Sequence, residues 1–236
     1  MGQIRDLYTV FVVTCAMALG ACGQSHAPSE SEDAEITPQQ FVLLPCGDAG
    51  EHHPCALAIA GGKRILFGAL GNAVSGLQSD DLRQLDAVFL FSLRSNDIEG
   101  LDDIRNRSWD AGRDTPLLVI GPTGTADFVS AINKAYEQAD ALRIVEDGIP
   151  PGGYDAAILV AREGRPAQTV FDTGDLVVRT VSGGYVIAYL DQSFVALLGC
   201  GAPNPSEVDI VVSCDPAEAD ANWPLQQRIR VSNGTP

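Results

Sequence analysis

The stretch Leu85-Asp86-Ala87-Val88-Phe89-Leu90-Phe91-Ser92-Leu93-Arg94-Ser95-Asn96-Asp97 decides how the rest of this chain is interpreted. Its apolar run at 87–91 is typical of a strand buried on both faces. A polar loop follows directly. Asn96 is a predicted N-cap for a helix over 97–107, and Asp97 is then a first-turn acid that the helix dipole favours. The stretch therefore predicts a buried strand, a polar loop and a helix in succession.

Further strands and helices flank this stretch on both sides. The Gly61-Gly62 pair between two β-rich runs predicts a hairpin of residues 55–60 and 64–68. A helix is expected over 125–139, where apolar residues recur at helical spacing. Other strands are predicted at 41–44, 117–120, 156–160, 176–181, 185–189, 194–198 and 210–213, and another helix at 78–85. A β-rich chain with helices concentrated in its middle predicts a mixed α/β (α+β) fold with packed sheets.

The composition fits one large globular domain or two small ones, because the chain has 236 residues and is 45% apolar. Lys and Arg number 15 and Asp and Glu number 31, so the formal net charge is −16. Such a charge repels nucleic acid and anionic lipid headgroups at long range. The composition therefore disfavours a nucleic-acid partner, and the acidity is otherwise explained by solubility.

The start of the chain predicts export. The apolar run at 10–19 is shorter than the roughly 20 residues that span a bilayer, and it suits a secretory signal. It ends in Leu19-Gly20-Ala21-Cys22, which resembles a bacterial lipobox, where the Cys is lipidated and becomes the mature N-terminus. Residues 1–21 are therefore predicted to be a lipoprotein signal peptide and Cys22 the lipidation site. The alternatives are an ordinary signal cleaved nearby and an uncleaved anchor.

Residues 22–40 are predicted to be a flexible acidic tether, because they are small, polar and acidic and have little to bury. Such a tether would hold a domain formed by residues 41–236 away from the membrane. The sequence thus predicts an exported, membrane-anchored lipoprotein that faces the periplasm and reaches the membrane through its N-terminal lipid.

Four segments in a fixed order resemble the metallo-β-lactamase superfamily, particularly its ribonuclease Z and arylsulfatase-like branch. These segments are the hairpin at 60–67, the strand at 85–90, the segment at 98–101 and the block at 115–128. The resemblance extends over about residues 41–145 and is weaker over 170–214. It implies an αββα sandwich that is C-terminally truncated, since the family's final strand and last His have no counterpart.

In that family a His-x-His-x-Asp-His motif follows the strand. Imidazoles and carboxylates there converge on zinc, and the metal activates a water that attacks an ester, amide or phosphodiester. The aligned positions in this chain are Ser92, Arg94, Asn96 and Asp97. Ser is a poor zinc ligand, Arg is a permanent cation, and Asn lacks the charge of the family's Asp. Only Asp97 retains ligand chemistry.

The family's later ligands are missing as well. No His follows the strand at 176–181, and the family's Gly-Asp-Thr motif aligns with Gly199-Cys200-Gly201, which leaves Cys200 as a possible ligand. The chain has 3 His: one lies in the tether, and His52 and His53 lie in the first loop. The resemblance therefore implies that zinc, the family's cofactor, has been lost, with no other cofactor in its place.

Four cysteines remain beyond the signal segment, namely Cys46, Cys55, Cys200 and Cys214. An even set in an oxidising periplasm indicates disulfides. Our first interpretation pairs Cys46 with Cys55 and Cys200 with Cys214. Free thiols are an alternative, and so is a zinc site built with the neighbouring His pair, although these Cys spacings are unusual for zinc.

Two polar segments have both a structural and a functional interpretation. Glu51-His52-His53 is either a solvated loop, which we favour because adjacent side chains diverge, or part of a catalytic site. Gly121–Thr125 precedes a helix and could bind an anion, although a turn with a Thr cap is the favoured interpretation.

The favoured hypothesis is a catalytically inactive relative of metallo-β-lactamase-fold hydrolases with a binding or structural role in the cell envelope. Ser92, Arg94 and Asn96 would then line a polar pocket for an anionic small molecule or an unidentified protein. The alternative is an ester or phosphodiester hydrolase whose rearranged or metal-free site uses Asp97, Cys200 or the His pair. A decayed product with no stable fold is a third hypothesis.

Overall fold

The computed structural model of the chain describes residues 40–47, 53–214 and 223–231. Residues 36–236 form one compact unit, which is separate from residues 1–35. The predicted signal peptide, Cys22, the tether up to residue 39 and His52 lie outside the described residues. In the described part of the chain, no helix is both long and apolar enough to cross a bilayer.

The first sheet has seven strands in the order β12-β1-β2-β3-β4-β5-β6. The strands β12, β1, β2 and β3 pair in antiparallel fashion, whereas β3, β4, β5 and β6 are parallel. Their bounds are β1 Phe41–Pro45, β2 Ala56–Ala60, β3 Lys63–Phe67, β4 Leu85–Phe89, β5 Leu117–Gly121, β6 Leu159–Glu163 and β12 Ile229–Val231.

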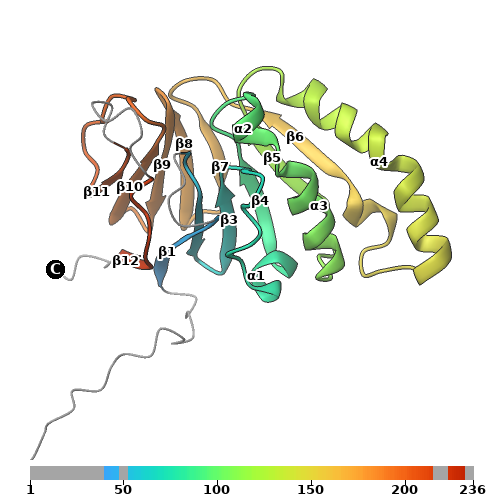
Figure 1. Cartoon of the computed structure of the whole chain (residues 1–236). Helices are drawn as coiled ribbons and strands as arrows, with labels where there is room; N and C mark the ends of the chain where they lie inside the picture. The colour runs from blue at the N-terminus through green and yellow to red at the C-terminus, as the bar shows by residue number, and fades with distance from the viewer. Residues whose placement is uncertain (1–39, 48–52, 215–222, 232–236) are drawn as a thin grey trace, which may run out of the picture. The chain divides into compact units, whose positions relative to one another are not determined.

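The helices cover one face of this sheet (Figure 1), because parallel neighbours need crossover connections. Leu101 and Ile104 of one helix and Val129 of another pack into an apolar layer with Leu57, Leu66 and other residues of that face. The helices are α1 Ser79–Arg83, α2 Ser95–Ile98, α3 Leu101–Asp110 and α4 Thr125–Asp147, followed by the 3-10 helix η1 Tyr154–Ala157.

The second sheet has five strands in the order β11-β10-β9-β8-β7. Strands β7 to β10 are antiparallel, and β11 is parallel to β10. Their bounds are β7 Thr169–Asp172, β8 Leu176–Val181, β9 Gly184–Tyr189, β10 Ser193–Leu198 and β11 Ile210–Val212.

The main core lies between the two sheets. Phe41, Phe67 and Phe89 of the first sheet meet Tyr185 and Tyr189 of the second, with ring centroids 5.1 Å apart for Phe89 and Tyr185 and 6.0 Å apart for Phe41 and Tyr189. The predicted mixed α/β fold of two packed sheets is therefore confirmed. In the described part of the chain, no helix covers the outer face of the second sheet. The crossover segment 199–209, which connects β10 to β11, packs on that face instead.

Two disulfides join neighbouring strand ends, and both match the first interpretation of the sequence. Cys46 follows β1 and Cys55 precedes β2, with Cα atoms 5.3 Å apart. Cys200 follows β10 and Cys214 follows β11, with Cα atoms 4.8 Å apart. Because β10 and β11 are parallel, both strands end on the same side, and the second disulfide joins the start of the crossover segment to the residues that follow β11.

Several predicted boundaries are wrong for identifiable reasons. The expected helix over 97–107 is interrupted at Gly100, whose N–H donates to the Ala69 carbonyl at 2.9 Å. A Cβ at Gly100 would lie 1.8 Å from the Leu70 carbonyl oxygen, so the chain bends where only Gly fits. Asn96 is consequently not an N-cap: Arg94 occupies that position of α2, and Asp97 is its first-turn acid.

Other boundaries shift in the same region and near the C-terminus. The expected strand at 156–160 begins only at Leu159, because Ala156 and Ala157 form η1 and pack against Trp109. Helix α4 continues past 139 to Asp147. The short edge strands β7 and β12 were not predicted.

A buried ion pair joins α3 to α4 and gives the first prediction. Arg105 is 0% and Asp140 is 3% exposed, and Arg105 Nη1 donates to Asp140 Oδ1 at 3.1 Å. Asp140→Ala should lower the free energy of unfolding in urea by about 3–5 kcal/mol, because it leaves a buried guanidinium unpaired. Asp103→Ala removes the exposed pair with Arg107 and should change stability by about 0.5 kcal/mol or less. Equal effects of the two variants would contradict the prediction.

Candidate functional site

The polar loops that contain the candidate residues lie at one end of the strands of the first sheet. We call this end of the sheet the site edge. The parallel strands β3, β4 and β5 all end there. The hairpin pairs Ala56, at the start of β2, with Phe67, at the end of β3, so the residues before β2 also reach this edge. The fold thereby brings His53 next to the loop after β4.

A hydrogen-bonded cluster occupies the loop after β4. The Ser92 hydroxyl donates to Asp97 Oδ2, and the Arg94 backbone N–H donates to Ser92 Oγ at 3.1 Å. His53 Nδ1 lies 3.4 Å from Asp97 Oδ1, and the Asn96 amide nitrogen lies 2.8 Å from His53 Nε2. The side chains of Ser92, Asn96 and Asp97 are thus paired with one another or with His53, whereas Arg94 contributes only its backbone N–H.

The cluster's hydrogen-bond directions limit its chemistry. Because the Asn96 amide nitrogen donates, His53 Nε2 accepts, and Nδ1 carries the proton that faces Asp97. The Ser92 hydroxyl donates to a carboxylate and not to an imidazole. The contacts therefore run from Ser92 to Asp97 and from Asp97 to His53. The direct contact between Ser and His that activates a serine nucleophile in triad enzymes is missing from this cluster.

His53 was expected in a solvated loop, and the structure instead places it in this cluster. The signal that could have found it was the hairpin itself, since antiparallel pairing returns the start of β2 to the end of β3. Cys200 is bonded to Cys214 and offers no thiolate ligand. Arg94 is exposed at the start of α2, and the described residues provide it with no ion-pair partner.

The predicted polar pocket is only partly formed. A cavity of about 240 Å³ beside the cluster is lined by His53, Asn96 and Glu99 together with Leu70, Gly71 and Asn72. Ser92 and Arg94 do not line it. The Glu99 carboxylate gives this cavity a negative wall.

Aromatic rings pack between the two sheets beneath the site edge. Tyr185 lies 5.7 Å from Phe67 and 5.5 Å from Phe91 between ring centroids. Its hydroxyl donates to the Leu90 carbonyl at 2.6 Å. Burial raises the pKa of the Tyr185 phenol well above its ordinary value, so the group stays protonated and remains a donor. Sequence reasoning missed Tyr185, which lies within an ordinary apolar strand pattern.

The donor set at this edge does not fit a zinc ion. Zinc in proteins is held by His, Cys and carboxylate groups. The 190 Å³ cavity between the ends of the two sheets is lined mainly by Gly, Pro and apolar residues, and its ionisable members are Arg165 and Tyr185. Within residues 40–47, 53–214 and 223–231, no group of three or more His, Cys, Asp and Glu side chains is placed to hold a metal ion.

The N-terminus of α4 is already occupied by a carboxylate of the protein. Gly124, the N-cap, adopts a left-handed φ of 100°, and its N–H donates to Glu163 Oε1 at 2.8 Å. The Ala126 N–H donates to the same oxygen at 3.2 Å. Thr125 closes the preceding turn through its hydroxyl, which donates to the Pro122 carbonyl at 2.6 Å. An external anion would therefore have to displace Glu163 from this helix terminus.

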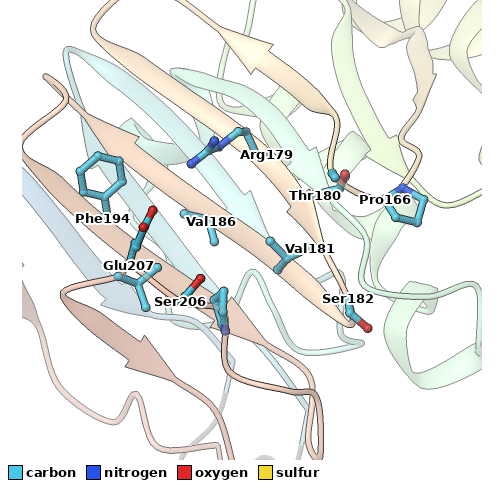
Figure 2. A pocket seen from close by; sticks show the side chains of 12 residues that line it. Pro166, Arg179, Thr180, Val181, Ser182, Val186, Phe194, Ser206 and Glu207 are labelled. Carbon is cyan, nitrogen blue, oxygen red and sulfur yellow. The ribbon is translucent and has the colours of Figure 1, made fainter.

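A wider groove of about 560 Å³ lies on the outer face of the second sheet (Figure 2). Val181, Val186 and Phe194 contribute apolar surface to it, and Arg179 on β8 and Glu207 on the crossover segment add opposite charges. This groove is remote from the degenerate motif in the chain, and no sequence pattern indicated it.

Comparisons with solved structures identify the architecture. The chain is similar to the short form of human tRNase Z, with a TM-score of 0.52 and 15% identity over 72% of this chain and 76% of that one. It is also similar to the metallo-β-lactamase fold protein YhfI of Bacillus subtilis, with a TM-score of 0.47 and 13% identity over 68% and 62%.

Zinc-bound PqqB of Methylobacterium extorquens is a further similar structure, with a TM-score of 0.46 and 13% identity over 74% and 70%. No protein-family model and no curated protein matches the chain. The fold is the metallo-β-lactamase fold, as the sequence resemblance implied. The similar structures include hydrolases of that fold, tRNase Z among them.

Glu163 yields the second prediction. Glu163→Ala should destabilise the protein by about 1 kcal/mol, the usual value of a helix N-terminal cap, and should open an anion site at the start of α4. Thermal unfolding with increasing phosphate should then show a concentration-dependent rise in Tm for the variant but not for the wild type.

A matched control lies at the other end of α4. Glu146→Ala removes an exposed carboxylate near the helix C-terminus, where the dipole disfavours negative charge, and should be neutral or slightly stabilising. Equal phosphate responses of wild type and Glu163→Ala would show that Glu163 does not block an anion site.

Proposed function

We propose that this chain is an exported, lipid-anchored protein of the cell envelope that uses the metallo-β-lactamase fold for a binding or structural role, without zinc and without hydrolysis. The supporting observation is the closed hydrogen-bond cluster of Ser92, Asp97, His53 and Asn96. Each side chain of this cluster is already engaged by a neighbour. Aromatic rings pack beneath the cluster and give the adjoining cavity an apolar wall.

An ester or phosphodiester hydrolase with a metal-free site is the second candidate, and one contact favours it. Asp97 accepts a hydrogen bond from the Ser92 hydroxyl and faces His53, so a carboxylate stands where a general base would be needed. Against it, Ser92 Oγ accepts the Arg94 N–H, and its hydroxyl faces Asp97 and not the imidazole that activates serine in triad enzymes.

For the binding role, we favour a protein partner over an anionic small molecule. Arg94 is an exposed cation at the site edge, but Asp97 and Glu99 lie in the same short segment and Glu163 already occupies the neighbouring helix terminus. A small anion would meet these carboxylates at close range. A protein surface can pair with Arg94 and place its own donors opposite Glu99.

Zinc content and turnover test the absence of hydrolysis. The purified chain should contain far less than one equivalent of zinc by elemental analysis after incubation with excess metal and desalting. It should not hydrolyse generic ester and phosphodiester substrates above background, with or without zinc or manganese. Stoichiometric zinc with chelator-sensitive turnover would overturn the proposal.

Asp97→Ala serves as the control for that assay. Turnover that disappears in Asp97→Ala without any dependence on metal would establish the metal-free hydrolase instead. Turnover that persists unchanged in the variant originates outside this site.

Acylation tests the envelope location. In a bacterial host fed a labelled fatty acid, the chain should acquire label and fractionate with membranes, and Cys22→Ala should abolish both. Cys15→Ala changes the other Cys of the signal segment and should leave labelling intact. Label retained in Cys22→Ala, or absent from the wild type, would refute the lipid anchor.

A further inference from the structure

The domain begins on the edge of the first sheet that lies opposite the site edge. Val42, in β1, pairs with Ile59, near the end of β2, and Ala60 pairs with Lys63, at the start of β3. Through the parallel pairs, the starts of β4, β5 and β6 lie on the same edge. We call this the tether edge, because the predicted tether of residues 22–40 ends at Phe41.

Helix α4 also ends on the tether edge. It leaves the end of β5 on the site edge and returns to the start of β6, so residues 148–158 lie on the opposite side from the degenerate motif (Figure 1). The side chains around this turn are exposed and aliphatic: Leu142 is 59%, Val145 82% and Ile149 78% exposed. Tyr154, in η1, is 37% exposed.

Leu190 is a further exposed apolar residue at this end of the fold, in the β9–β10 turn of the second sheet. It follows Tyr189, whose ring packs against Phe41 with centroids 6.0 Å apart, so it lies on the tether edge as well. Leu190 is 38% exposed and has a φ of 54°, a left-handed conformation that is unfavourable for a bulky residue. A strained backbone thus holds an apolar side chain at the tip of the β9–β10 turn.

The distribution of exposed apolar side chains singles out this edge. Seven large hydrophobic residues are exposed in the described ranges. Leu142, Val145, Ile149, Tyr154 and Leu190 lie in or next to the connections at the tether edge, and Val160 is the second residue of β6, which starts there. Single exposed apolar residues are normal, but their concentration on one side indicates a contact surface.

We propose that the tether edge is a lipid contact surface on which the anchored domain rests, with the site edge turned away from the membrane. The proposal rests on the lipid anchor proposed above. A flexible chain as long as residues 22–40 has a root-mean-square span of about 25 Å, so the anchor keeps the edge close to the bilayer. Side chains such as Ile149 then enter the headgroup region, as apolar anchors of interfacial proteins do.

Charge selects the kind of lipid surface. The cations Lys63 and Arg143 of this edge are already paired with Asp86 and Asp110. Glu146, Asp147 and Asp155 lie beside the aliphatic side chains of α4 and η1, and Asp191 follows Leu190. These carboxylates oppose an anionic surface at short range. The occupant is therefore a neutral, zwitterionic lipid surface, and added anionic lipid should weaken the contact.

Depth-dependent quenching tests the contact independently of acylation. Residues 23–236, which include the whole compact unit, carry an N-terminal hexahistidine that binds phosphatidylcholine vesicles containing a nickel-chelating lipid. Ile149→Trp places a fluorophore on the tether edge, and Thr123→Trp places one on the site edge, where Thr123 is exposed. Brominated acyl chains should quench Ile149→Trp at least about twofold more than Thr123→Trp after correction for the native tryptophans.

Equal quenching at both positions would overturn the lipid contact. If acylation at Cys22 fails but the selective quenching is observed, the anchor is refuted and the contact surface stands. If the selective quenching is absent and the chain sediments as a dimer, the apolar edge belongs to an interface between copies, and the lipid contact is refuted.

Loss of the aliphatic side chains provides a second readout. Vesicle partition of the untethered chain should fall at least about tenfold in Leu142→Gln/Val145→Gln/Ile149→Gln, because about 1.4 kcal/mol of apolar transfer corresponds to that factor. Val211→Gln makes the same chemical change at an exposed residue on the outer face of the second sheet and should leave partition unchanged. Equal losses in both variants would refute the contact surface.

Discussion

The contact between Tyr185 and the end of β4 constrains the rest of this structure. The phenol donates to the Leu90 carbonyl, and its ring packs among Phe67, Phe89 and Phe91. This contact ties the two sheets together at the site edge and satisfies a buried carbonyl that would otherwise lack a partner. Beyond Leu90, the polar side chains of Ser92, Asn96 and Asp97 pair with one another and with His53.

Polar groups also pair with one another where β6 ends. Glu163 at the end of β6 receives the N–H groups at the start of α4, which are the free donors of any helix N-terminus. Ser92, Asp97, His53 and Asn96 satisfy each other in the same way. Pairing of this kind satisfies polar groups that would otherwise lack partners, and it stabilises the scaffold at the site edge.

The sequence predicted the features of the fold that depend on local residue patterns. The Gly61-Gly62 hairpin and the apolar strands follow from spacing and composition, and the metallo-β-lactamase fold followed from the order of segments. The disulfide pairing was a first interpretation among the three that four cysteines allow, and the structure has the same pairs. Contacts between distant segments were not predictable in this way. His53 reaches Asp97 only because β2 pairs with β3, and Gly100 interrupts a helix because the Leu70 carbonyl lies against it. Tyr185 reaches the Leu90 carbonyl because the second sheet packs on the first, and Glu163 reaches the start of α4 because β6 pairs with β5. Local sequence patterns do not predict such contacts.

Strand direction gives the two edges of the first sheet different surroundings. Parallel strands place all the loops after β3, β4 and β5 on one side and the start of β1 on the other. A chain anchored through residues before Phe41 is therefore held by the edge that carries none of those loops. This separation depends only on strand register, so it would hold for any anchor at the N-terminus. A protein partner of the proposed kind would then approach Arg94 and Glu99 from the side opposite the attachment point, where the bilayer does not obstruct it.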